Sequence, residues 1–368
     1  MNARDSAVKP LFAAGEASGR FHHEYWPAWL LYLPLVPYLA WLALRYGGLS
    51  TPTCVNPGIE AGGGFVGERK SEIMRALGSG PRVLASALIE AHEDPAERAA
   101  RVAHFAENSA GGFPVILKPD VGQRGYAVRR VGSEAEARAY FATMRADALV
   151  QVYHPGPHEI GVVWARSTPE PVNGRVGFIY SVTRKEFPVL VGDGRRTLKQ
   201  LILSHPRYRR QARVFLARLG EACSRVPSKG EQVSLGLAGN HCQGALFRDG
   251  SDLITPALEK AIDELAASFV GGLDYGRFDL RYADEGELRR GVGFGVVELN
   301  GSTGEPTAMY DPRRGLAFAY GLLFGQWRLL FRLGAWRRAA GARPTSVRSL
   351  VRAWRAHVAV RSGSAISD

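Results

Sequence analysis

Short runs of apolar residues recur along this chain with two different spacings. Alternating apolar and polar positions predict β-strands, and apolar residues three or four apart predict amphipathic helices. The strands predicted in this way are 115–117, 126–131, 148–153, 159–165, 176–182, 189–191, 233–237, 278–282 and 292–299. The predicted helices begin near Glu68, Pro95, Ser133 and Thr197, and two more cover 206–222 and 256–270. Because strands and helices alternate without a strict repeat, we predict an α+β body with antiparallel sheets.

One apolar run fits neither pattern, because residues 25–44 contain no charge over twenty positions. Its length fits a bilayer. However, Pro34 and Pro37 would kink a helix near its middle, and its aromatic residues are spread along it, as in a segment lying in a membrane interface. Three interpretations stay open: a membrane span, an interfacial or re-entrant segment, and a buried core segment. A secretory signal is not predicted, since the run lacks a basic start and a small-residue cleavage site.

The length and composition indicate a folded protein with a substantial core. The chain has 368 residues, of which 46% are hydrophobic and 22% charged, so two or three subdomains are expected. Its three cysteines, Cys54, Cys223 and Cys242, fit no metal-binding or redox spacing. This usage predicts a reducing compartment, the cytoplasm.

The net charge of +12 is distributed very unevenly. Residues 312–367 contain eleven arginines and no acidic residue, and leucines, phenylalanines and tryptophans are interleaved with them. This mixture suits an anionic membrane surface. It suits equally a C-terminal pair of helices packed on the body with a solvated basic face. Nucleic acid is not an expected partner, because no nucleic-acid-binding module is recognisable.

A lysine closes one of the predicted strands in a setting that suits phosphate. Lys118 follows the apolar run 113–117 and precedes Pro119 and a loop with Gly122 and Gly125. Glycines allow backbone N–H groups to approach an anion closely. The pattern therefore predicts a phosphate-binding loop.

Oxygen ligands occur near the ends of the last two predicted strands. Glu298 and Asn300 are two residues apart, so their side chains point the same way from one strand. Asp279 lies on the preceding strand, and hairpin pairing would bring it beside them. A carboxylate within an apolar run needs a partner, and hard oxygen ligands suit magnesium, or manganese in its place. We therefore predict a metal site formed by Asp279, Glu298 and Asn300.

In this order, the motifs from about residue 70 to 305 resemble the ATP-grasp fold of carboxylate–amine ligases, such as D-alanine–D-alanine ligase and the ATP-grasp region of cyanophycin synthetase. The resemblance implies two α+β subdomains that clamp ATP, at 68–153 and 154–310. They would follow an atypical hydrophobic segment at 1–67 and precede a basic helical tail at 311–368. Related ligases carry a βαβ-type domain first, which is here reduced or replaced.

The resemblance also implies roles for individual residues. Gln151 stands where a glutamate is usual, and its amide oxygen would accept from the adenine amino group. The nucleotide-binding residues implied are Lys70, Lys118, Gly122, Gly125, Gln151, Val152, Tyr153, Glu159 and Asn240. The catalytic residues implied are Arg277 and either Lys185 or Arg184. Gly304 and Asn56 are the substrate-side candidates, although Thr303 replaces the usual proline beside Gly304 and Asn56 also fits a structural turn.

The implied reaction uses ATP and magnesium. ATP phosphorylates a small-molecule carboxylate, and an amine, or less often a thiol, then displaces phosphate from the acyl phosphate. The uncharged run and the basic tail add an expected site of action at the anionic inner face of the cytoplasmic membrane. Two rival hypotheses are a catalytically silent nucleotide-binding regulatory protein associated with the membrane, and a phosphotransferase of the same fold. The sequence predicts neither substrate's identity nor the oligomeric state.

Overall fold

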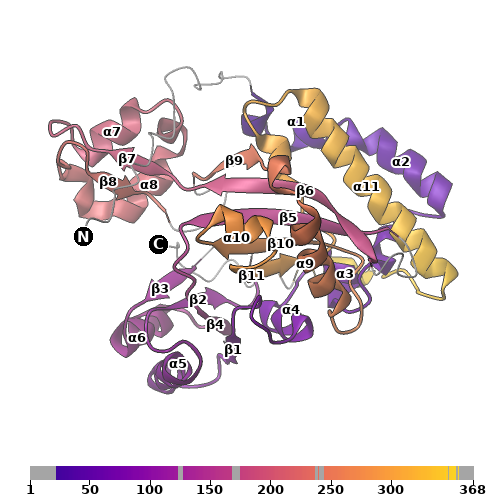
Figure 1. Cartoon of the computed structure of the whole chain (residues 1–368), viewed down its shortest axis with the longest axis horizontal. Coiled ribbons are helices and arrows are strands. Elements are labelled where there is room, and N and C mark those ends of the chain that lie inside the picture. Colours follow the sequence, from indigo (N-terminus) through magenta and orange to yellow (C-terminus); the bar gives the residue numbers. More distant parts are fainter. Residues whose placement is uncertain are drawn as a thin grey trace.

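Two antiparallel sheets organise the fold of this computed structural model, which describes residues 22–122, 127–167, 175–236, 239, 244–346, 348–353 and 355 (Figure 1). The smaller sheet has the strand order β1-β4-β2-β3, and the larger has the order β11-β10-β5-β6-β9. The strands are β1 (Ser86–Ile89), β2 (Val115–Pro119), β3 (Arg129–Val131), β4 (Ala148–Val152), β5 (His158–Arg166), β6 (Gly177–Glu186), β9 (Leu246–Asp249), β10 (Tyr275–Tyr282) and β11 (Phe294–Asn300). The predicted α+β class with antiparallel sheets is confirmed.

Helices α5 (Pro95–Ser109) and α6 (Glu134–Thr143) cover one face of the smaller sheet (Figure 1). On β2, Val115 and Leu117 pack into the core beneath these helices. Because side chains alternate along a strand, Ile116 and Lys118 point from the opposite face, where a pocket lies. The alternation of side chains along β2 therefore places Lys118 in that pocket.

The larger sheet is covered on both faces. Ile160, Val162 and Trp164 of β5 belong to a core cluster with helix α9 (Pro256–Ala267). Val163 and Ala165 point the other way and belong to a cluster with helix α11 (Leu316–Ala339). Helices α4 (Lys70–Leu77) and α10 (Glu285–Arg289) add side chains to the α9 cluster. A central strand buried on both faces accounts for the nearly continuous apolar run in β5.

The N-terminal apolar run folds into two helices, α1 (Ala28–Tyr32) and α2 (Leu35–Tyr46), which lie along α11 (Figure 1). The break falls next to Pro34, as the sequence predicts. The rings of Tyr38 and Phe324 stack across the α2–α11 contact, with their centroids 4.9 Å apart. Among the residues described here, no helix combines the length and apolar character that crossing a bilayer requires.

Helix α11 forms the first half of the arginine-rich region and packs on the body of the protein. It packs Leu323, Leu330 and Phe331 against the body. Near its end, Arg337 forms an ion pair with the buried Asp274 at 2.6 Å. The first half of the predicted tail is thus an integral part of the fold, in agreement with the interpretation of a helix packed on the body.

A third unit lies at the far end of β6 (Figure 1). It combines a ribbon of β7 (Val189–Val191) and β8 (Gln232–Ser234) with helices α7 (Leu198–Ser204) and α8 (Ala212–Leu219). The helical prediction for 206–222 is met by three short pieces, α8 and the 3-10 turns on either side of it, and α8 ends at Gly220 with φ 52°. Short helix α3 (Glu60–Gly64) lies elsewhere, and 3-10 turns occur at His23–Tyr25, Thr51–Cys54, Tyr208–Gln211, Gly220–Ser224, Ser251–Leu253 and Thr307–Tyr310.

Candidate active site

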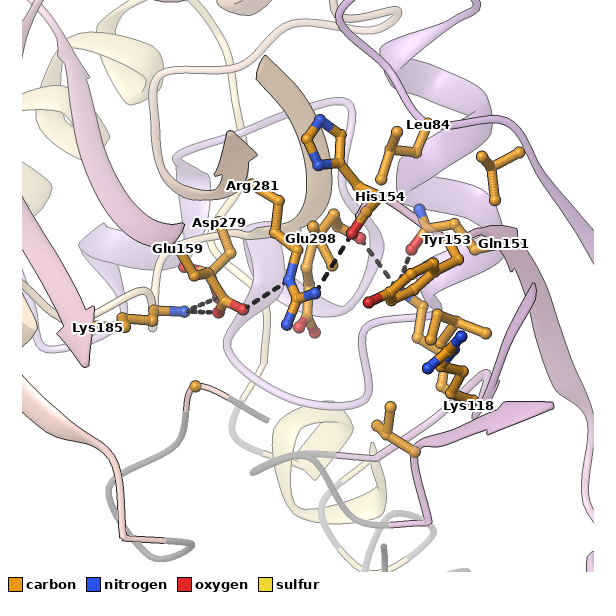
Figure 2. Close-up of a pocket in the computed structure, with 16 residues that line it drawn as sticks. Leu84, Lys118, Gln151, Tyr153, His154, Glu159, Lys185, Asp279, Arg281 and Glu298 are labelled. Carbon is orange, nitrogen blue, oxygen red and sulfur yellow. Dashed lines mark hydrogen bonds and ion pairs between the residues drawn. The ribbon is translucent and has the colours of Figure 1, made fainter. Parts of the chain in front are cut away.

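A pocket lies between the smaller and the larger sheet (Figure 2). In this view Leu84, Tyr153 and Gln151 are on one side, and Lys185, Glu159 and Asp279 are on the other. Its further lining residues include Ile116, Lys118, Val128, Arg130, Val152, His154, Arg281, Val297 and Glu298. The pocket thus offers apolar and aromatic surface at one side and a dense set of charges at the other.

Lys118 connects the two sheets. Its Nζ donates to Gln151 Oε1 on the smaller sheet and to the carbonyl of Val297 on the larger, both at 2.9 Å. The side chain is only 4% exposed. Burial lowers the pKa of Lys118 to about 8, although Glu298 acts in the opposite direction. A bound anion such as a phosphate would favour the charged form of this lysine.

Gln151 presents a donor to the pocket. Lysine can only donate, so the amide oxygen of Gln151 must face Lys118, and its NH2 group points elsewhere. That Nε2 atom is buried and has no hydrogen-bond partner among the residues described. The amide oxygen keeps a second lone pair, so its predicted contact with an adenine amino group stays a prediction. The NH2 group is a second possible contact, as a donor to a ring nitrogen of the base.

Val152 and Tyr153 line the same side of the pocket. The N–H of Val152 already donates to the carbonyl of Ala85 at 3.0 Å, so it is not available to a ligand. The ring of Tyr153 lies 4.8 Å from the guanidinium of Arg130, in a cation–π contact. An aromatic ring and a guanidinium plane are both surfaces on which a flat base can stack.

Five charged residues form a buried network on the opposite side, and four of them are labelled in Figure 2. Lys185 Nζ lies 2.8 Å from Glu159 Oε1 and 3.0 Å from Asp279 Oδ2, and Arg281 Nε lies 3.4 Å from Glu159 Oε2. Arg277 Nε lies 3.1 Å from Asp279 Oδ1. Burial acts to raise the pKa of Asp279, but Arg277 and Lys185 outweigh it, and the pKa falls below its ordinary value. Asp279 is therefore a stable carboxylate.

Lys185 and Arg184 alternate across β6, and this decides between the two catalytic candidates. Lys185 enters the pocket. Arg184 instead forms ion pairs with Asp252 and Glu285 at 2.6 and 3.0 Å, away from the pocket lining. The expectation of a catalytic Arg184 is corrected, because successive side chains of a strand point to opposite faces.

The predicted metal residues are neighbours across one hairpin. In the antiparallel pairing of β10 with β11, Asp279 lies opposite Glu298 and Arg277 lies opposite Asn300. The predicted hairpin pairing is confirmed. A carboxylate has more lone pairs than Arg277 and Lys185 occupy, so Asp279 retains capacity for a metal ion. The buried Nδ2 of Asn300 has no partner among the described residues, which leaves this amide ready for a ligand.

Lys70 reaches the same region from helix α4. Its Nζ donates to the carbonyl of Gly122 at 2.6 Å and lies 3.6 Å from Glu298 Oε1. Gly122 has φ 155° and belongs to the predicted phosphate loop. Gly125 and Asn240, which were also predicted to bind nucleotide, lie outside the described residues.

The two substrate-side candidates have structural roles. Asn56 is fully buried: its Oδ1 accepts from the N–H groups of Asp274 and Tyr275, and its Nδ2 donates to the carbonyls of Gly63 and Tyr275. The N–H of Gly304 donates to the carbonyl of Gly301 at 2.8 Å. Neither residue can offer these groups to a substrate in this arrangement, so both expectations are corrected.

Several residues near the site are not among those predicted from the sequence. Arg281 and Glu68 are the most important, since Arg281 binds Glu159 and Glu68 accepts from the N–H of Gly301. Arg281 was detectable, because it lies two residues after Asp279 and shares its face of β10. Tyr32 was not detectable from the sequence. Its hydroxyl donates to Glu305 Oε1, and nothing in the apolar run indicates that contact.

Comparison with solved structures finds several chains similar to this one at low identity. A bifunctional glutathione synthetase from Pasteurella multocida is 17% identical, with 70% of this chain and 36% of that chain covered and a TM-score of 0.36. D-alanine–D-alanine ligase from Bacillus anthracis is 14% identical, with 74% of this chain and 69% of that chain covered and a TM-score of 0.40. The VanG D-Ala:D-Ser ligase from Enterococcus faecalis is 16% identical, with 72% of this chain and 61% of that chain covered and a TM-score of 0.39.

These similarities concern overall shape and do not define a residue's role. D-alanine–D-alanine ligase, which the sequence motifs resemble, is among the similar structures. This chain spans about a third of the length of the glutathione synthetase. No protein-family model matches the chain, and no curated protein matches its sequence.

Proposed function

We propose that this chain is an ATP-grasp ligase that uses ATP and magnesium to activate a carboxylate as an acyl phosphate and joins it to an amine. One observation carries the proposal. Lys118 from the smaller sheet and Lys185 from the larger line a single pocket with the carboxylates of Asp279 and Glu298. Cations from two sheets beside a set of hard oxygen ligands are what a triphosphate and its metal ion need.

The apolar side of the pocket supports binding of the nucleotide base. Leu84, Ile116 and Tyr153 supply apolar and aromatic surface, and the unpaired NH2 group of Gln151 supplies a donor. Small-molecule pockets usually combine such surface with a few polar groups that fix the orientation of the ligand. Glu159 would hold ribose hydroxyls, and Lys118 and Lys70 would hold the phosphates.

The oxygen ligands support a divalent metal ion. Asp279, Glu298 and Asn300 would hold magnesium, which supplies positive charge to the phosphate oxygens when bound. Asp279 also binds Arg277 and Lys185, so the same carboxylate orients two cations of the site. Arg277 would hold the oxygens of the activated carboxyl group, for which a planar forked cation is well suited.

The reaction then runs in two steps. A substrate carboxylate oxygen forms a bond to the γ-phosphorus while the bond to the β-phosphate oxygen breaks, which yields ADP and an acyl phosphate. The amine nitrogen next forms a bond to the carbonyl carbon, the bond to the phosphate oxygen breaks, and inorganic phosphate leaves as the amine loses a proton. The residues orient the reactants and offset charge, so no side-chain nucleophile is required.

The experiment that tests this function is ADP release by the purified full chain with a panel of amino acids, short peptides and lipid-like carboxylates. A ligase shows ADP release that depends on both a carboxylate and an amine. A phosphorylated product that accumulates without an amine would instead show a phosphotransferase. Binding of ATP with magnesium but no stimulated turnover would favour the regulatory alternative.

The proposal includes a site of action at an anionic membrane surface. Helices α1 and α2 bury Leu31, Leu35 and Leu42 on one side. Their other side is apolar and exposed, together with the turn that follows α2. Its large side chains, which we call the α1–α2 patch, are Trp29, Leu33, Val36, Trp41, Leu44 and Leu49. Clustered exposed apolar side chains mark binding surfaces. The exposed Arg45 of α2 and Arg328 of α11, the helix that packs on α2, would meet lipid phosphates.

We expect the double variant Trp29→Ser/Leu44→Ser to bind vesicles of phosphatidylglycerol and phosphatidylcholine at least about tenfold more weakly than wild type. These side chains are 69% and 87% exposed, so their replacement leaves the core intact. The measurement is flotation of the protein with the vesicles. Val191→Ser, which removes an exposed valine from β7 at the opposite end of the molecule, is the control. Equal flotation of wild type and double variant would contradict the membrane proposal.

A further inference from the structure

A second, smaller cavity lies beside the candidate metal residues. Its lining includes Glu68, Lys70, Gly122, Glu298 and Asn300. Lys70, Glu298 and Asn300 already have proposed roles toward phosphate and metal. Glu68 has none, although it contributes a carboxylate to the same cavity.

The Glu68 carboxylate is tightly packed against the backbone around Gly64 and Gly301. Its Oε1 accepts from the N–H of Gly301 at 2.8 Å. A Cβ atom at Gly301 would lie 2.6 Å from that oxygen, and a Cβ at Gly64, where φ is 89°, would collide with it. Thus Gly64 and Gly301 leave room for the carboxylate, and a side chain at either position would displace it.

The Glu68 carboxylate forms no ion pair in the described part of the chain, although Lys70 and Arg277 act on its charge from a longer distance. Lys70, the nearest lysine in sequence, pairs with Glu298, and Glu68 accepts its hydrogen bond from the backbone N–H of Gly301. Partial withdrawal of a carboxylate from water without an ion pair is costly. Burial accordingly raises the pKa of Glu68 to about 7, despite the hydrogen bond from Gly301. A positively charged ligand would remove this cost.

The neighbouring amide also lacks a partner. The buried Nδ2 of Asn300 finds no acceptor among the described residues and lines the same cavity. The cavity therefore offers a negative group at Glu68 and an unused donor at Asn300. ATP, the acyl phosphate and inorganic phosphate are anions that Glu68 would repel. Besides the magnesium ion, which the proposed function assigns to Asp279, Glu298 and Asn300, only the amine carries a positive charge before it reacts.

We propose that this cavity is the binding site of the acceptor amine, with Glu68 as the residue that binds its ammonium group. The inference rests on the proposed ligase function and names the class of acceptor, a primary amine. The site lies next to Lys70, Glu298 and Asn300, so an amine held there is close to the residues assigned to the phosphates and the metal. Glu68 is then a specificity-determining residue.

The test compares two acceptors in the full chain, with ATP, magnesium and the carboxylate that stimulates ADP release most. Glycinamide is the primary-amine probe. Hydroxylamine, which is uncharged near neutral pH, traps the acyl phosphate as a hydroxamate. We expect Glu68→Gln to lower kcat/KM for glycinamide by about 10- to 100-fold, mainly through KM. The rate of hydroxamate formation should stay within about twofold, because that step does not need the ammonium site.

Matched variants separate recognition from misfolding. Glu72→Gln makes the same change on α4 at a half-exposed position and should match wild type with both acceptors. Glu68→Asp keeps the charge and should retain part of the glycinamide activity. A thermal midpoint for Glu68→Gln equal to that of wild type shows that the fold is intact.

Three outcomes would overturn the inference. Wild type that makes hydroxamate but does not respond to glycinamide would show that the cavity takes no primary amine. An equal loss of both activities in Glu68→Gln, with an altered magnesium requirement, would assign Glu68 to the metal instead. Wild type that forms no hydroxamate with any carboxylate would overturn the proposed function itself, and the inference with it.

Discussion

Glu298→Gln is expected to lower carboxylate-stimulated ADP release by about 1,000-fold, because a metal ion that neutralises phosphate charge contributes several kcal/mol to the transition state. The variant removes one negative charge from the proposed metal residues and changes almost nothing else. Glu298 is half-buried, and its ion pair with Lys70 is long at 3.6 Å. The fold should therefore be unaffected.

Glu72→Gln is the control for the Glu298 variant, because Glu72 also pairs at 3.5 Å with one basic residue and lies outside both cavities. The measurement is ADP release at saturating ATP, with circular dichroism to check the thermal midpoint of each variant. ADP release within tenfold of wild type in Glu298→Gln would show that Glu298 is not essential for metal binding.

Lys185→Met is expected to have the largest effect on stability, a loss of about 3–5 kcal/mol in the free energy of unfolding. Lys185 is 6% exposed and lies within 3.0 Å of the carboxylates of both Glu159 and Asp279. The charges of Asp279 and Glu159 raise the pKa of Lys185 above its ordinary value and overcome the opposing effect of burial. Removing this lysine leaves two buried carboxylates with only Arg277 and Arg281 beside them.

The thermal midpoint of Lys185→Met, measured by circular dichroism, should fall by roughly 4–7 °C. Arg184→Met is a matched control on the same strand. Arg184 pairs with Asp252 and Glu285, whose side chains are well exposed, so its loss should cost only about 0–1 kcal/mol. Equal midpoints for the two variants would contradict the buried network as an element of stability.

The parts of the site that the sequence predicts depend on the alternation within strands. Glu298 and Asn300 share a face because they are two residues apart, and a hairpin brings Asp279 opposite Glu298. Lys118 points into the pocket for the same reason. Arg184 and Lys185 could not be separated in this way, since that choice depends on which face of β6 meets the pocket.

The incorrect expectations involve partners that lie far away along the chain. Asn56 accepts from Asp274 and Tyr275, which are more than two hundred residues away, and a turn motif gives no sign of such partners. The orientation of Gln151 was not predicted, because it depends on Lys118, which lies on a different strand. The packing of helix α11 could not be predicted either. Its own apolar residues lie on all sides of the helix, so its sequence does not indicate a single buried face.

The most direct test of the proposed ligase is the fate of carboxylate oxygen. The carboxylate that stimulates ADP release is labelled with 18O and incubated with the full chain, ATP, magnesium and an amine, and the inorganic phosphate is examined by mass spectrometry. Activation through an acyl phosphate predicts one 18O atom in each phosphate released with the amide product. Unlabelled phosphate, released while the carboxylate keeps both of its 18O atoms, would contradict the proposed reaction.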